Sequence, residues 1–196
     1  MTENILFNLN RETADHGCFN AWDRLPFTPS KGPAHRDLLA RNLLLSNFNS
    51  YNGLDTDDDS AYFHMKDNVL LYGHFLKSDF SGHDIEYDGD LGIFVHESNQ
   101  YQPVPATHLN VEHDCTIVSA TDGENLFSLT ADTCANLTDF PDVYNVRVYS
   151  PSASTTVCRK SIAAWQALGK LRNVTAAPLP ADAATIVGWA RAKLGM

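Results

Sequence analysis

The sequence predicts a mainly β protein that forms a single domain, with helices added to its β body. Short runs of β-branched and aromatic residues recur from Ala61 to Tyr149, at spacings of roughly 8 to 12 residues. Turn formers such as Asp122-Gly123 separate these runs, and helical periodicity replaces them after Ser161. This arrangement favours a barrel or a sandwich of strands over alternating βα units. No internal repeat is evident.

The segment from Ala34 to Ser46 is predicted to form a helix near the N-terminal side. Its leucines stand at positions 38, 39, 43 and 45, and no proline or glycine interrupts it. A polar loop with an acidic cluster, Asp55 to Asp59, is expected next. Alternate aspartates open calcium-binding loops, but the sixth position would be Ser60 instead of glycine and the twelfth Lys66 instead of glutamate. We therefore expect a solvated acidic loop, with calcium as the alternative.

The stretch from Leu126 to Tyr149 predicts a hairpin. Apolar and polar residues alternate up to Cys134, turn formers occupy the next segment, and a β-branched run resumes at Val143. Pairing of the two strands would bring the Cys134 thiol near the Arg147 guanidinium. A cation in that place favours a thiolate and a developing oxyanion.

Two C-terminal helices are predicted, at Ser161 to Leu171 and at Asp182 to Leu194. In the first, Ser161 is the expected N-cap, and apolar residues recur at positions 162, 165, 168 and 171. A proline-containing loop separates the two helices. We expect their tryptophans to anchor them to the β body.

Composition limits the classes of partner. The 14 Lys and Arg residues against 24 Asp and Glu residues give a formal net charge of −10, which argues against nucleic acid or an anionic membrane surface. No apolar run reaches the roughly 20 residues of a transmembrane helix, and no signal-peptide pattern is evident, so we expect no direct membrane insertion and leave the localisation open. The four cysteines lack CxxC spacing. His74, His83, Asp84 and His96 also lack a ligand spacing, so no metal site is expected there.

Several motifs resemble the sortases, the cysteine transpeptidases of bacterial cell surfaces. The segment from Asn68 to His74, NVLLYGH, is similar to the family's asparagine, short apolar strand and Gly-His. The segment from Thr130 to Cys134, TADTC, resembles the Thr-Leu-x-Thr-Cys motif, with Ala131 in place of leucine. Arg147 follows at a distance within the family's range. Phe80 with Gly89-Asp90, and Gly32-Pro33-Ala34-His35, are weaker similarities.

The resemblance implies a closed β-barrel over residues 1–150. The helical and acidic segment at about 34–60 would be an insertion in it, and the helical C-terminal appendage over 151–196 would lie outside it. It implies His74, Cys134 and Arg147 as catalytic residues and Thr133 as a substrate-binding residue. The Cys134 thiolate would attack a peptide carbonyl of a sorting signal. His74 would donate a proton to the leaving amine and later accept one from an acceptor amine. Arg147 would stabilise the oxyanion. No cofactor is implied.

Two alternatives stay open. One is a cysteine protease with chymotrypsin-like residue order, although the surroundings of Cys134 lack a Gly-x-Cys-Gly element. The other is a non-catalytic β-barrel structural or binding protein on a sortase-like scaffold. Ala131 and the missing membrane anchor favour this second alternative. A thiol-reactive probe would distinguish the enzyme from the binding protein, because only an activated Cys134 would react selectively.

Overall fold

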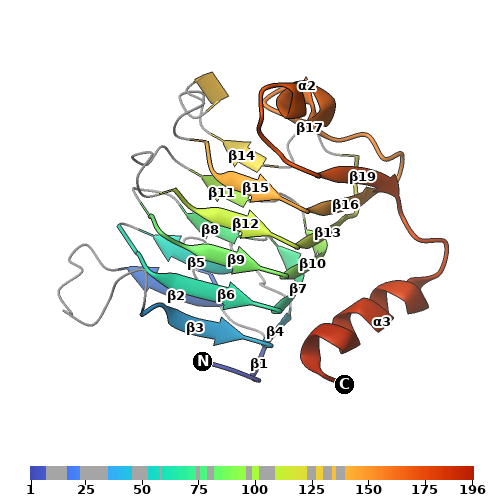
Figure 1. Ribbon diagram of the computed structural model, residues 1–196. Coiled ribbons are helices and arrows are strands. Elements are labelled where there is room, and N and C mark those ends of the chain that lie inside the picture. Colours follow the sequence, from blue (N-terminus) through green and yellow to red (C-terminus); the bar gives the residue numbers. More distant parts are fainter. Residues whose placement is uncertain are drawn as a thin grey trace.

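The chain winds around three parallel β-sheets, so that each turn of the chain stacks on the one before it (Figure 1). The computed structural model describes residues 1–7, 17–22, 35–45, 53–57, 59–73, 76–78, 82–95, 99–101, 109–122, 127–129, 134–135 and 140–196. Every third strand returns to the same sheet, one layer further along the stack. This arrangement is a parallel β-helix, and each layer is called a rung below.

The three sheets are named I, II and III in the order in which the chain visits them. Sheet I consists of β1 (Ile5–Phe7), β4 (Leu43–Leu45), β7 (Val69–Gly73), β10 (Leu91–Val95), β13 (Thr116–Ser119), β16 (Arg147–Ser150) and β19 (Thr175–Pro178). Sheet II consists of β2 (Phe19–Trp22), β5 (Leu54–Asp57), β8 (Leu76–Ser78), β11 (Asn99–Tyr101) and β14 (Phe127–Leu129). Sheet III consists of β3 (Asp37–Ala40), β6 (Phe63–Lys66), β9 (Glu86–Asp88), β12 (Val111–His113) and β15 (Asp142–Tyr144).

Parallel pairing aligns side chains in columns that run along the stack. In sheet I, Leu91 pairs with Val69 on one side and with Thr116 on the other. Because side chains alternate between the two faces of a strand, each column points either into the stack or out of it. The inward columns are mostly apolar, and they form the core with Leu44, Leu70, Ile117 and Val148 from sheet I and Leu39, Met65 and Val143 from sheet III.

One corner of every rung uses the left-handed backbone conformation. At the turn from sheet III to sheet I, φ is positive at Glu3, Arg41, Asp67, Gly89, Asp114, Asn145 and Asn173. Asp, Asn and Gly adopt this conformation at the least cost, which explains their frequency here. The turn is short, so the chain can enter the next strand in register.

The residues that follow these turns form a buried hydrogen-bonded ladder. Asn42 Oδ1 accepts bonds from both the backbone nitrogen and the Nδ2 of Asn4, each at 3.0 Å. Asn68 Oδ1 accepts the same two bonds from Asn42, at 3.1 and 2.8 Å. Asp90 Oδ1 accepts them from Asn68, at 2.8 and 2.9 Å. The ladder satisfies buried polar groups and fixes the register of four successive rungs.

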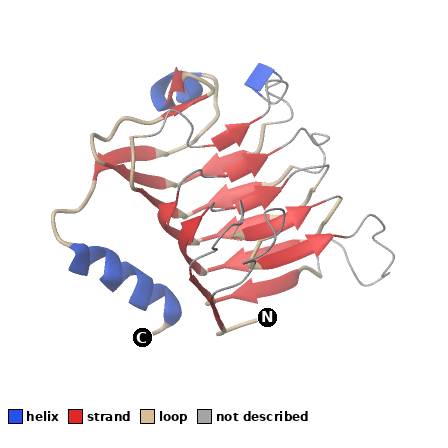
Figure 2. Ribbon diagram, turned by 180° about the vertical axis from the view of Figure 1, so that it is seen from behind, coloured by secondary structure: helices blue, strands red, loops and turns tan. Residues whose placement is uncertain are grey.

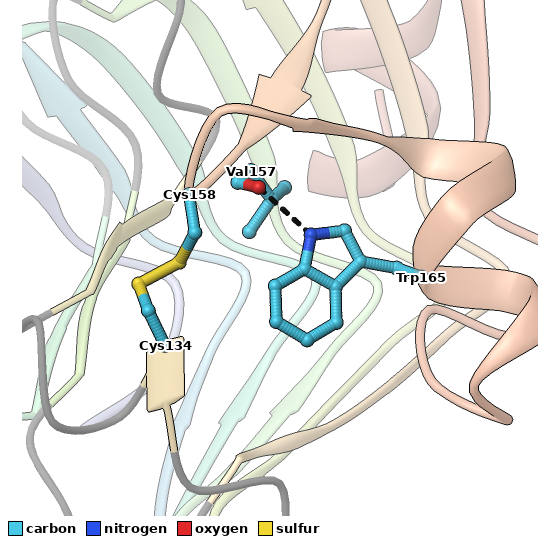
Figure 3. The surroundings of a disulfide bond; sticks show 4 residues. All are labelled: Cys134, Val157, Cys158 and Trp165. Carbon is cyan, nitrogen blue, oxygen red and sulfur yellow. Dashed lines mark hydrogen bonds between the residues drawn. A yellow bond between two sulfur atoms is a disulfide. The ribbon is translucent and has the colours of Figure 1, made fainter.

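A cap lies at the C-terminal end of the stack. It contains the small antiparallel pair β17 (Thr156–Val157) and β18 (Lys160–Ser161) and the helix α2 (Ile162–Ala167). Trp165 of α2 is fully buried and donates a hydrogen bond from Nε1 to the Val157 carbonyl at 2.7 Å (Figure 3). Its ring packs on the ring of Phe140. A disulfide between Cys134 and Cys158 joins this cap to the segment after sheet II (Figure 3).

The second helix, α3 (Ala183–Leu194), lies outside the stack against sheet I (Figures 1 and 2). Its Ile186 packs with Val69, Leu91 and Val118, which are outward residues of that sheet. Lys193 Nζ bonds Asp67 Oδ1 at 2.8 Å. Asp182 caps the start of the helix by accepting a bond from the Ala184 nitrogen, and Gly195 ends it in the left-handed conformation.

The structure confirms a mainly β protein with two C-terminal helices and corrects finer predictions. The closed barrel is wrong for the described residues, because their strands form three separate sheets and pair in parallel within each sheet. The hairpin of Leu126 to Tyr149 is also wrong, since β14 pairs with β11 and β16 pairs with β13 and β19. The predicted helix of Ala34 to Ser46 contains β3 and β4 instead, separated by the left-handed turn at Arg41.

Two further sequence-based expectations need correction. The run from Val143 to Tyr149 is not one strand, because it turns at Asn145 and passes from sheet III to sheet I. The repeat missing from the sequence is present in the structure. Its length varies, since 22 residues separate the turn residues Asp67 and Gly89 whereas 38 separate Glu3 and Arg41.

The burial of Asp90, the last residue of the ladder, predicts that the stability of the protein depends on pH. Burial raises its pKa from 3.8 to about 7, although bonds from Asn68 oppose the change. Between these values the folded state keeps a proton that the unfolded state has lost, so stability falls as pH rises toward 7 and stays low above it. Asp90→Asn keeps the acceptor oxygen and removes the charge. We expect it to raise stability by on the order of 4 kcal/mol at pH 8 and by roughly half as much at pH 5, where the unfolded carboxyl has already lost its proton.

Thermal unfolding of both proteins at the two pH values measures this difference. The reciprocal change Asn42→Asp places a carboxyl in the same ladder and should give the opposite sign at pH 8. Equal effects of Asp90→Asn at pH 5 and pH 8 would contradict a raised Asp90 pKa.

Replacing Gly89 by alanine is predicted to destabilise the protein in two ways, through backbone strain and through a steric clash. Its φ is +71°, and a Cβ there would meet Asp67 Oδ1 and Lys193 Nζ, both at 2.8 Å. Gly169 has a similar φ of +75° with no atom within 4 Å, so Gly169→Ala measures the backbone strain alone. We expect Gly169→Ala to cost about 1 kcal/mol and Gly89→Ala about 2 kcal/mol or more. Chemical denaturation would measure both, and equal losses would show that the contact of Lys193 with Asp67 does not matter.

Candidate functional site

A cleft of about 700 Å³ lies between α3 and the outer face of sheet I. Residues of β10, β13, β16 and β19 form one wall, the left-handed turns form the rim, and one face of α3 forms the other wall. The lining residues are Leu91, Asp114, Thr116, Asn145, Arg147, Tyr149, Asn173, Thr175, Trp189, Ala192 and Lys193. The cleft is therefore built from equivalent positions of successive rungs.

One outward column of sheet I changes its chemistry at this cleft. After the exposed Ile5, its members Leu43, Val69 and Leu91 pack in the apolar cluster under α3. Its later members are Thr116, Arg147 and Thr175, which pair directly with one another in the sheet. Neighbouring strands are about 4.8 Å apart, so these three polar side chains repeat at that spacing. The column is apolar where the helix covers it and polar where the cleft exposes it.

A second polar column forms the rim. Asn173 Nδ2 donates to Asn145 Oδ1 at 2.9 Å, and Asn145 Nδ2 donates to Asp114 Oδ1 at 3.2 Å. These three residues occupy the left-handed position of their turns. The turn geometry that holds the rungs in register thus also aligns amide and carboxylate groups along the cleft.

An aromatic pair lies on the other side of the polar column. Tyr149 is two residues after Arg147, so it points to the same face of β16. Its ring lies 4.9 Å from the ring of Trp189 on α3, with an interplanar angle of 34°. Both side chains are half-buried and line the cleft. They offer an apolar surface beside hydrogen-bonding groups.

The charged side chains that line the cleft differ in whether they have a partner within the protein. Asp114 accepts from Asn145 and lies 2.7 Å from His113 Nδ1, and Lys193 pairs with Asp67. Arg147 is exposed, and its guanidinium makes no ion pair or side-chain hydrogen bond to another described residue. The cleft therefore presents one cation whose charge no described carboxylate balances.

Of the site residues predicted from the sequence, the structure describes Cys134 and Arg147. Arg147 lines the cleft, but Cys134 is bonded to Cys158, so its sulfur is not a thiolate in this state. His74 and Thr133 lie outside the described residues. The roles of His74, Cys134 and Arg147 in acyl transfer stay predictions, and they require this disulfide to be reduced.

Most residues of the cleft were missed from the sequence. Asn145 stands in no motif of known chemistry, and Asn173 and Thr175 stand only in an Asn-x-Thr triplet, which is frequent by chance. Tyr149 and Trp189 belong to runs that predict core positions. A usable signal was present, because an Asp, Asn or Gly precedes the apolar run at Asp67, Gly89, Asp114, Asn145 and Asn173. From the sequence, Asn145 is instead predicted to lie inside one strand from Val143 to Tyr149.

A group of possible metal ligands lies next to the rim. Within the described part of the chain, Asp88, His113 and Asp114 bring ligand atoms within 4.8 Å of one another. Burial alone would lower the pKa of His113, but hydrogen bonds to Asp114 and Glu86 outweigh it and raise the pKa. Asp88 also accepts a bond from Lys66 Nζ at 2.5 Å. These ion pairs link successive rungs, and a cation would have to displace the His113 proton.

The predicted acidic loop is partly strand. Asp55 and Asp57 belong to β5, and Asp55 is buried and accepts bonds from the Gly17 nitrogen and from Asn20 Nδ2. Asp58 lies outside the described residues. Calcium binding at Asp55 to Asp59 stays a prediction.

The comparisons with known proteins add no assignment. No protein-family model, no curated protein and no solved structure matches this chain. Among the helices of the described ranges, none has the length and the apolar character needed to cross a membrane.

The disulfide gives a direct prediction for thiol chemistry. Burial raises the pKa of the Cys18 thiol to about 11, and burial, with Glu112 and Asp90 nearby, raises that of Cys115. We expect neither thiol to react quickly with a maleimide at neutral pH in the folded protein. Mild reduction should expose two reactive thiols, Cys134 and Cys158. Because the bond closes a loop of 24 residues, its loss should lower stability by about 3 kcal/mol.

Mass spectrometry of the labelled protein and a denaturation curve with and without reductant measure these effects. The variant Cys134→Ser/Cys158→Ser is the control for reduction. Rapid labelling of Cys134 before reduction would contradict the disulfide and would support an activated nucleophile.

Proposed function

We propose that this protein is a non-catalytic saccharide-binding protein whose binding site is the cleft between α3 and sheet I. The observation that carries the proposal is the column of Thr116, Arg147 and Thr175, exposed between a rim of asparagines and an aromatic wall. The proposal retains the non-catalytic binding-protein alternative, with a parallel β-helix as the scaffold in place of a sortase-like barrel.

The chemistry of the cleft suits a sugar chain. A pyranose ring has a rim of hydroxyl groups and an apolar face of C–H groups, so it needs hydrogen-bonding partners on one side and an aromatic surface on another. Asn173 and Thr175 supply the first, and Tyr149 with Trp189 supplies the second. Because the polar side chains repeat once per rung, an elongated ligand can meet equivalent groups along its length.

Other ligand classes fit less well. A nucleic acid would need several cations along its backbone, whereas the cleft contains Arg147 and the paired Lys193 within a protein of net charge −10. A sorting-signal peptide cleaved by Cys134 would need a free thiolate, which the bond to Cys158 removes. The resemblance to sortases stays a prediction.

Filling the cleft tests the proposal. Thr116→Trp and Thr175→Trp place a bulky ring in the cleft without changing the inward core. Thr121→Trp adds the same ring at an exposed position after β13 that does not line the cleft. On an array of oligosaccharides, the wild type and Thr121→Trp should bind the same sugars, and the two cleft variants should lose at least tenfold in affinity.

Thermal unfolding of each variant verifies that it is folded before binding is compared. Absence of any binding by the wild type, or unchanged binding by both cleft variants, would rule out the proposed site.

A further inference from the structure

We infer that the saccharide bound in this cleft carries a carboxylate, and that Arg147 selects for it. This inference rests on the proposed function and adds the chemical class of the ligand. Three features support it: the unbalanced charge of Arg147, its central position in the polar column, and the fixed geometry of the groups around it.

The charge of Arg147 is the first feature. The other charged side chains that line the cleft, Asp114 and Lys193, already have protein partners of opposite charge or hydrogen-bond partners. The Arg147 guanidinium has none among the described residues. A protein with a net charge of −10 repels anions at long range, so an anionic ligand must be recognised by a local contact. Arg147 supplies such a contact.

The position of Arg147 is the second feature. It stands between Thr116 and Thr175 in the sheet, with one neighbour on each adjacent strand. The planar guanidinium can donate two parallel hydrogen bonds to one carboxylate, which a lysine ammonium cannot do. The threonine hydroxyls on both sides can bind the ring hydroxyl groups of the same or the neighbouring sugar. One charged contact per three rungs fits a ligand that is acidic but not densely charged.

The surroundings are the third feature. Arg147 starts β16 directly after the Asn145-Val146 turn, and its backbone nitrogen donates to the Cys115 carbonyl at 3.0 Å. Asn145 is held between Asn173 and Asp114 by hydrogen bonds on both sides. The strand and the rim that position Arg147 are therefore ordered before the ligand binds, which reduces the entropy lost on binding.

Matched pairs of ligands test the inference. Each pair contains an acidic oligosaccharide, built with uronic acid or sialic acid residues, and the same oligosaccharide with its carboxylates converted to methyl esters. For the pairs that bind, we expect the wild type to prefer the acidic member by at least tenfold in Kd. Arg147→Gln should raise the Kd of the acidic member at least tenfold and leave that of the ester within twofold. Arg147→Lys should give an intermediate Kd.

Arg191→Gln is the matched control, because Arg191 is exposed on α3 and does not line the cleft. It should leave every Kd within twofold of the wild type. Equal affinities for acid and ester, or a preference that survives Arg147→Gln, would overturn the inference while the proposed function stands. If neither member of any pair binds although a neutral oligosaccharide does, the inference alone fails; if no oligosaccharide binds, the proposed function itself fails.

Discussion

The left-handed turn between sheets III and I is the constraint on which the rest of this structure depends. At each rung it turns the chain sharply enough for the next strand to start in register with the strand of the preceding rung. The ladder of Asn4, Asn42, Asn68 and Asp90 then links the backbone of one rung to the side chain of the next. Because the Oδ1 atoms of Asn42, Asn68 and Asp90 each accept two bonds, a shift of register would leave buried polar groups without partners. Order along the stack follows from this local geometry.

The candidate site uses the same regularity. The parallel register aligns side chains in columns, and one column can be apolar under a helix and polar beyond the end of that helix. α3 covers Val69 and Leu91, and the cleft opens where the column continues as Thr116, Arg147 and Thr175. The helix is held by Ile186 in the apolar cluster and by the ion pair of Lys193 with Asp67, a contact for which Gly89 leaves room. The parts that stabilise the β-helix therefore also position the residues of the cleft.

The sequence predicted the local elements better than their pairing. The strands after Ala61 and the capped helix ending at Leu194 follow from periodicity and turn chemistry, which are local properties. Parallel pairing is not local, because a turn such as Asp67-Asn68 reads alike whether the chain reverses within one sheet or passes to the next sheet. The helix predicted at Ala34 to Ser46 failed for a similar reason, since Leu39 and Leu44 lie in inward columns of different sheets. Of the cleft residues, Arg147 is named from the sequence, as a cation beside Cys134 on a hairpin that does not form. Asn145, Asn173 and Trp189 come together only through an alignment of rungs whose lengths differ.

The three tryptophan indoles offer the most direct test of the central claim, that ligand binds in the cleft. Trp189 lines it, Trp165 is buried in the cap, and Trp22 is exposed on sheet II. The indole N–H signals can be followed by NMR while an acidic oligosaccharide that binds is titrated into the protein. The account predicts that the Trp189 signal shifts with ligand concentration while those of Trp165 and Trp22 stay in place. A shift of Trp22 or Trp165 with an unchanged Trp189 would contradict it.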